Sequence, residues 1–62
     1  MSETERFKFV QSIIANLKGE LMTQIWNEPS PTKRRSLRLA YEPRIKKWAY
    51  ELEELRRKIN AR

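Results

Sequence analysis

The sequence predicts an all-α fold, an antiparallel helical hairpin, on the strength of three observations. Apolar residues recur at alternating spacings of three and four in both halves of the chain, as on one face of a helix. The halves are separated by the proline-containing stretch NEPSPT, which is typical of a loop. All eight acidic residues are Glu, a good helix former, and Gly occurs once. At this length the chain is expected to form one domain over residues 1–62.

The first helix is expected over about residues 3–27. Ser2 followed by Glu5 has the spacing of a capping box, in which side chains satisfy free amides at the helix start. One apolar stripe then runs along the helix, made of Phe7, Val10, Ile14, Leu17, Leu21 and Ile25. Pro29 and Pro31 should end this helix, because the residue before a proline avoids helical geometry and proline has no amide hydrogen.

The second helix is expected over about residues 32–61, after a loop at residues 28–31. Ser30 is a good capping residue, and the ring of Pro31 is already suited to a first helical turn. The apolar stripe of this helix consists of Leu37, Tyr41, Ile45, Trp48, Leu52, Leu55 and Ile59. A loop of three or four residues brings consecutive helices side by side and antiparallel, which gives the hairpin.

Pro43 lies inside the second stripe and leaves two alternatives open. A continuous helix could kink near residues 42–43, where proline removes one backbone hydrogen bond. Alternatively, a short helix could end at Tyr41 and another begin at Pro43. The stripe continues without interruption through this point, which favours the kink.

The predicted hairpin has more apolar surface than its two helices can cover. Phe9, Ile13, Met22 and Trp26 flank the first stripe and widen it beyond what one partner helix hides. A lone chain of 62 residues also has a marginal core. We therefore expect a homodimer that packs as a helical bundle, with Trp26 against the loop prolines or the second copy.

Positive charge is concentrated in the second half of the chain. The net charge of +6 divides into −1 for residues 1–31 and +7 for residues 32–62. Residues 33–47, called the basic segment below, hold seven cationic side chains and the single acid Glu42. The candidate binding residues are Lys33, Arg34, Arg35, Arg38, Arg44, Lys46 and Lys47, together with Tyr50, whose ring could stack on a base.

Two kinds of partner fit this pattern. A dense cluster of cations is typical of a protein that binds the backbone of DNA or RNA, because binding releases condensed counterions. The segment contains no Asn or Gln to read base edges, so contacts to phosphate are expected rather than sequence readout. Alternatively, the chain is a small adaptor or inhibitor that binds a protein target, with the cations as a steering surface. It would use exposed apolar residues such as Phe9, Trp26, Leu39 and Tyr50. A basic face can also serve only to keep a protein in solution.

The composition argues against an enzyme. The chain has no His, Cys or Asp, so ordinary nucleophile and base pairs and most metal sites cannot be assembled. One Gly is too few for a glycine-rich phosphate loop. We therefore expect no catalytic residue, cofactor or metal. Acidic residues near the N-terminus and the lack of a membrane-length apolar run predict a cytoplasmic protein with no membrane partner.

Overall fold

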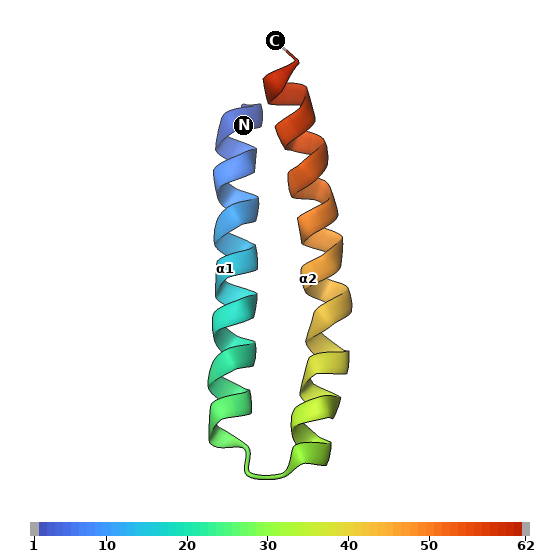
Figure 1. Ribbon diagram of the computed structural model, residues 1–62. Coiled ribbons are helices and arrows are strands. Elements are labelled where there is room, and N and C mark those ends of the chain that lie inside the picture. Colours follow the sequence, from blue (N-terminus) through green and yellow to red (C-terminus); the bar gives the residue numbers. More distant parts are fainter. Residues whose placement is uncertain (1, 62) are drawn as a thin grey trace.

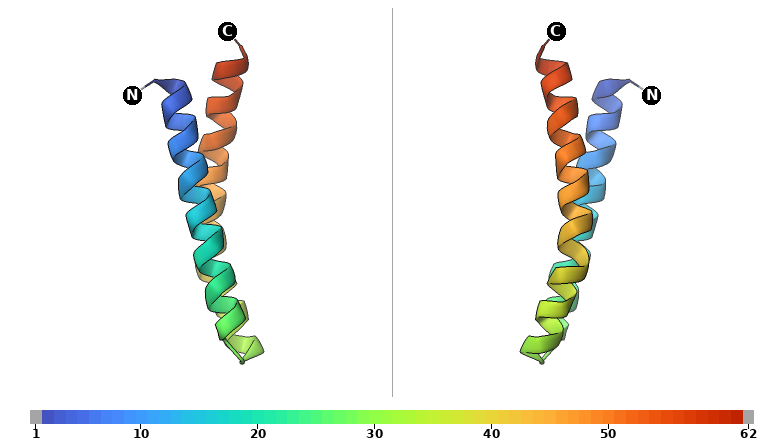
Figure 2. Two further views of the ribbon diagram at one scale, coloured as in Figure 1. Left: turned by 90° about the vertical axis from the view of Figure 1, so that its left-hand side faces the viewer. Right: turned by 90° about the vertical axis from the view of Figure 1, so that its right-hand side faces the viewer.

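A computed structural model describes residues 2–61 and confirms the helical hairpin. Helix α1 spans Glu3–Asn27 and helix α2 spans Pro31–Asn60, and the two run antiparallel side by side (Figure 1). The hairpin is a narrow rod with extents of 48 × 14 × 14 Å. Seen from the side, the helices overlap near the loop and separate toward the termini, so they cross at a shallow angle (Figure 2). Neither helix has a stretch long and apolar enough to cross a bilayer within the described residues.

Both helices begin at the serine caps indicated by the sequence. The Ser2 hydroxyl accepts the Glu5 amide hydrogen over 3.1 Å and donates its own hydrogen to the Glu5 carboxylate over 3.2 Å. The Ser30 hydroxyl accepts from the Lys33 amide over 3.5 Å, and Pro31 occupies the first turn of α2. Each cap satisfies an amide that would otherwise lack a helical partner.

The connection between the helices is fastened by hydrogen bonds around Glu28. Its backbone amide donates to the Ile25 carbonyl over 3.2 Å, and its carboxylate accepts from the Ser30 amide over 3.1 Å. The Glu28 carbonyl accepts from the guanidinium Nε of Arg34, which belongs to α2. The loop end of the hairpin is therefore tied to the start of the basic segment.

The core is thin because each helix buries only the side that faces the other. Val10 is fully buried and Leu55 is 9% exposed, and these two make up the buried core of the described residues. The remaining stripe residues are half-buried: Phe7, Ile14, Leu17, Leu21, Ile25, Leu37, Tyr41, Ile45, Trp48, Leu52 and Ile59. Both predicted stripes therefore face the interface, yet much of their area stays accessible.

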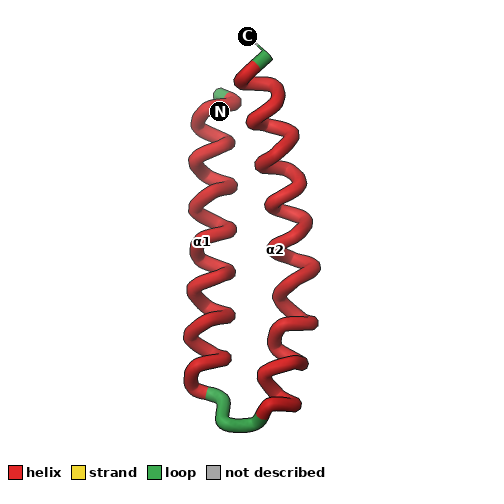
Figure 3. The backbone as a smooth tube through the Cα atoms, in the orientation of Figure 1, coloured by secondary structure: helices red, strands yellow, loops and turns green. Residues whose placement is uncertain are grey.

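Helix α2 continues without interruption through Pro43 (Figure 3). The alternative in which a helix ends at Tyr41 and a new one begins at Pro43 is wrong. Pro43 and Leu39, whose carbonyl loses its usual amide partner, both lie on the exposed side of the helix. That carbonyl can be hydrated there, so the missing hydrogen bond does not force the helix to stop.

Polar contacts join the helices at two levels. Near the termini, the Arg6 guanidinium bonds the Glu51 carboxylate at 2.7 Å from Nη2 and 3.0 Å from Nε. Nearer the loop, the Tyr41 hydroxyl accepts from Gln24 over 2.7 Å and donates to Glu20 over 3.4 Å. These contacts fix how α1 and α2 are aligned, because each joins residues far apart in the sequence.

Candidate functional site

The seven cations of the basic segment all lie on α2 between Lys33 and Lys47 and are exposed. Across residues 2–61, the ion pairs join Arg6 to Glu51, Arg56 to Glu53 and Arg57 to Glu54. All three pairs lie outside the basic segment. Its positive charge is therefore not neutralised by a salt bridge within the described chain.

The continuous helix distributes these cations around its circumference. Because α2 turns once every 3.6 residues, Arg35 and Lys46 lie eleven residues and about three turns apart on one line. Leu39 and Tyr50 have the same separation and lie beside them, on the side directed away from α1. We call these four residues the outer face of α2. Of the other basic residues, four lie toward the two edges of the hairpin: Lys33, Arg38, Arg44 and Lys47. Arg34 lies three residues before Leu37, on the side of the apolar stripe.

The outer face combines charge with exposed apolar surface. Tyr50 is 72% exposed and Leu39 is 62% exposed, as their positions opposite the apolar stripe predict. From Arg35 to Tyr50 the face extends about 22 Å along the helix, given a rise of 1.5 Å per residue. This face presents two cations and an aromatic ring in one row, a combination that suits a polyanion with flat rings.

Arg34 has a second role that the sequence does not reveal. Its Nε donates to the Glu28 carbonyl and so holds the loop against α2. A guanidinium carries five N–H donors, so four remain for a ligand. A hydrogen bond to the loop therefore restricts the orientation of the Arg34 side chain. The Arg35 side chain has no hydrogen bond of this kind among the described residues.

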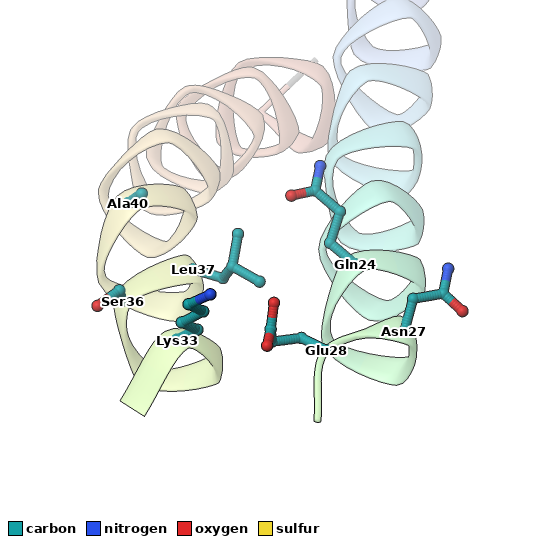
Figure 4. A pocket seen from close by; sticks show the side chains of 7 residues that line it. All are labelled: Gln24, Asn27, Glu28, Lys33, Ser36, Leu37 and Ala40. Atoms are coloured by element: carbon teal, nitrogen blue, oxygen red, sulfur yellow. The ribbon is translucent and has the colours of Figure 1, made fainter. Parts of the chain in front are cut away.

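A cleft of about 520 Å³ lies between the helices near the loop. The lining residues, drawn in Figure 4, are Gln24, Asn27, Glu28, Lys33, Ser36, Leu37 and Ala40. Gln24, Glu28 and Leu37 extend into the space between the helices, whereas Asn27 points away from it (Figure 4). Lys33 shares this cleft with the Glu28 carboxylate, so opposite charges lie in one small volume. The cleft is consequently a poorer anion site than the outer face.

Trp26 was predicted only as an anchor for a protein partner and was not among the predicted nucleic-acid-binding residues. Its side chain is 87% exposed, so the expectation that it packs against the loop prolines is wrong within this chain. Trp26 lines an open hollow of about 360 Å³ together with Ile25 and Arg34. The signal was present in the sequence, because Trp26 lies about 100° around the helix from Ile25 and so falls outside the apolar stripe.

The pairing of Arg6 with Glu51 was not predicted, because it depends on how the two helices are aligned. The guanidinium carbon of Arg6 lies 5.4 Å from the centre of the Phe9 ring and 5.8 Å from that of Trp48. Arg6 is thus held by a carboxylate and two aromatic faces. We assign Arg6 a structural role, because its charge is already paired with the Glu51 carboxylate of the other helix.

Residues 2–61 contain no group of three or more His, Cys, Asp or Glu placed to hold a metal ion. Comparisons with protein-family models, with curated proteins and with solved structures found no match to this chain. The arrangement of charge and aromatic side chains is therefore the basis for assigning a function.

Proposed function

We propose that this protein is a non-enzymatic binding protein that holds the phosphate backbone of DNA or RNA through the basic segment of α2. One observation supports this most strongly: seven exposed cations lie within fifteen residues, and the ion pairs of residues 2–61 include none of them. Unneutralised Lys and Arg side chains at this density bind polyphosphate chains because binding releases the counterions condensed on the polyanion.

The outer face of α2 is the part of the segment best placed to make these contacts. Arg35 and Lys46 project from it in line, and Tyr50 adds a ring that can stack or lie along a sugar. Arg38 and Arg44 lie at the two edges of the hairpin and can contact the flanking backbone. Since the segment has no Asn or Gln, binding should depend little on base sequence.

We also propose that the protein acts as a homodimer. The chain exposes 5165 Å², and a compact monomer of 7.6 kDa would expose about 4,300 Å². The excess of about 900 Å² is close to the roughly 800 Å² that each partner buries in a standard protein interface. A second hairpin would cover the half-buried stripes and double the number of cations available to one ligand.

Charge reversal on the outer face tests the nucleic-acid proposal. Arg35→Glu with Lys46→Glu should lower affinity for a labelled 20-nucleotide probe by more than about tenfold and reduce the salt slope by about two. Arg34 is left unchanged because its loss would also release the Glu28 carbonyl. Fluorescence anisotropy measures affinity, and circular dichroism checks that helicity is retained.

Arg56→Glu with Lys58→Glu is the matched control, since it changes the net charge by the same amount outside the segment. Arg57 is left unchanged because it lies eleven residues beyond Lys46 and so continues the line of Arg35 and Lys46. The control should lose much less affinity than the outer-face variant. Equal losses in the two variants would show that net charge alone drives binding and would contradict the proposed site.

A protein partner is the second candidate function, and a specific observation favours it. Five large apolar side chains stay exposed in the hairpin: Phe9, Met22, Trp26, Leu39 and Tyr50. Exposed aromatic residues beside cations are typical of interface anchors. An adaptor of this kind would bind one protein with little dependence on salt, and Leu39→Ala would weaken it more than reversal of Arg35 and Lys46.

A further inference from the structure

The loop end of the hairpin carries an exposed indole beside a fixed cation. Trp26 is more exposed than the other large apolar side chains of the described residues, and it lines an open hollow with Ile25 and Arg34. An indole on the surface of a protein loses the stabilisation that burial would give it. Nothing within the hairpin covers this ring, because the neighbouring loop is fastened to α2 instead.

Arg34 forms the charged wall of the same hollow. Its Nε–H is bonded to the Glu28 carbonyl, which restricts the orientation of the guanidinium before any ligand arrives. Four N–H donors remain, and a guanidinium plane matches the two oxygens of a phosphate. A fixed guanidinium loses less side-chain entropy on binding than a free one.

We propose that Trp26 is a stacking platform for an unpaired base and that Arg34 binds the adjoining phosphate, so that the preferred ligand is single-stranded nucleic acid. This inference rests on the proposed function and specifies its substrate class. A base in a duplex has both faces covered by its neighbours, whereas an unpaired base can lie on an aromatic ring. The flat ring therefore selects for single strands, and the cation selects for a polyanion over an uncharged apolar partner.

The test uses three probes: a twelve-nucleotide oligothymidylate, a DNA duplex of the same length and inorganic polyphosphate, which has no bases. Trp26→Ala should lower affinity for the single strand about tenfold, in the range that one base stacked on an aromatic ring produces. Affinities for the duplex and for polyphosphate should change less than about twofold, because stacking contributes only where a base is unpaired. In a Trp48→Phe background, the remaining Trp26 fluorescence should be quenched by the oligothymidylate and not by polyphosphate.

Two control variants separate stacking from loss of apolar surface. Met22→Ala removes an exposed apolar side chain one turn earlier on α1 and should leave all three affinities unchanged. Trp26→Phe keeps a flat ring and should retain most of the single-strand affinity. Circular dichroism should show the same helicity for every variant, because both positions are exposed.

The outcomes distinguish this inference from the proposed function. If Trp26→Ala weakens all three probes equally, or none of them, the stacking role is overturned while backbone binding stands. If the wild-type protein binds neither the oligonucleotides nor polyphosphate, the proposed function itself fails. Tight binding of a protein that protects Trp26 from quenching, without any binding to single strands, would also overturn the inference.

Discussion

At the scale of single residues, Arg6 of α1 contacts α2 through both an ion pair and an aromatic ring. It pairs with Glu51 over 2.7 Å and lies over the rings of Phe9 and Trp48. About a third of each charged side chain is exposed, so the ion pair contributes at most about 1 kcal/mol. The contacts to the rings add roughly 0.5–1 kcal/mol.

Replacing Arg6 by Ala should therefore destabilise the hairpin by about 1–2 kcal/mol. Urea denaturation followed by circular dichroism measures this change in the free energy of unfolding. Arg57→Ala is the control, because its pair with Glu54 lies within one helix and is more exposed, and it should cost less than about 0.5 kcal/mol. If Arg6→Ala and Arg57→Ala lower the free energy of unfolding equally, the contacts of Arg6 with α2 contribute no more than an ion pair within one helix.

Residue roles of this kind could be predicted only in part from the sequence. The exposure of Leu39 and Tyr50 follows from helical periodicity within one element. The partners of Arg6 and Tyr41 depend on how α1 and α2 are aligned, which no local pattern specifies. Arg34 belongs to the basic segment by its sequence position, but its bond to the Glu28 carbonyl arises from the loop conformation.

At the scale of elements, local signals determined the helices well. The serine caps, the prolines and the apolar stripes are all properties of a few consecutive residues, and they led to both helices and the loop. The continuity of α2 through Pro43 could not be settled in the same way. It depends on whether the freed Leu39 carbonyl faces water or a neighbour, which becomes known only once the helices are packed.

Gly19 offers a test of intrinsic helix stability in α1. It is exposed in the middle of the helix, its φ is negative, and a Cβ added there would meet nothing within 4 Å. Gly19→Ala should stabilise the protein by about 0.5–1 kcal/mol, because Ala loses less backbone entropy in a helix. Ala15→Gly, at an exposed position one turn earlier, should destabilise by a similar amount. A loss of stability in Gly19→Ala would mean that this surface is covered by a partner.

Pro43 offers the corresponding test in α2. Pro43→Ala restores an amide that can bond the Leu39 carbonyl and removes the clash of the proline ring. The variant should be more stable by roughly 1–2 kcal/mol, after allowing for the greater freedom of its unfolded chain. The midpoint of urea unfolding should rise with an unchanged slope. A loss of more than about 1 kcal/mol would contradict a continuous helix at this position.

At the scale of the whole molecule, the hairpin is long and thin for its size. Its radius of gyration is 14.4 Å, against about 10.6 Å for a compact domain of 62 residues. Such a shape leaves the two apolar stripes half-buried and gives the chain a large area for its mass. The same shape arranges the basic segment as an extended line of charge.

Light scattering should therefore find a mass near twice 7.6 kDa at low micromolar concentration. The midpoint of thermal unfolding should rise with protein concentration, because protomers that are only marginally stable alone unfold as the dimer dissociates. A well-folded monomer whose midpoint is independent of concentration would contradict the homodimer. It would leave the outer face of α2 as a site formed by a single hairpin.

The salt dependence of nucleic-acid affinity tests the central claim most directly. Wild-type protein is titrated with a duplex and with a single-stranded oligonucleotide at several salt concentrations. Three to five phosphate contacts per subunit predict a slope of log affinity against log salt of roughly −2.7 to −4.5 per subunit for the duplex, and a shallower one for the single strand. A slope near zero, or dissociation constants weaker than about 100 μM for both probes at physiological salt, would contradict backbone binding by the basic segment.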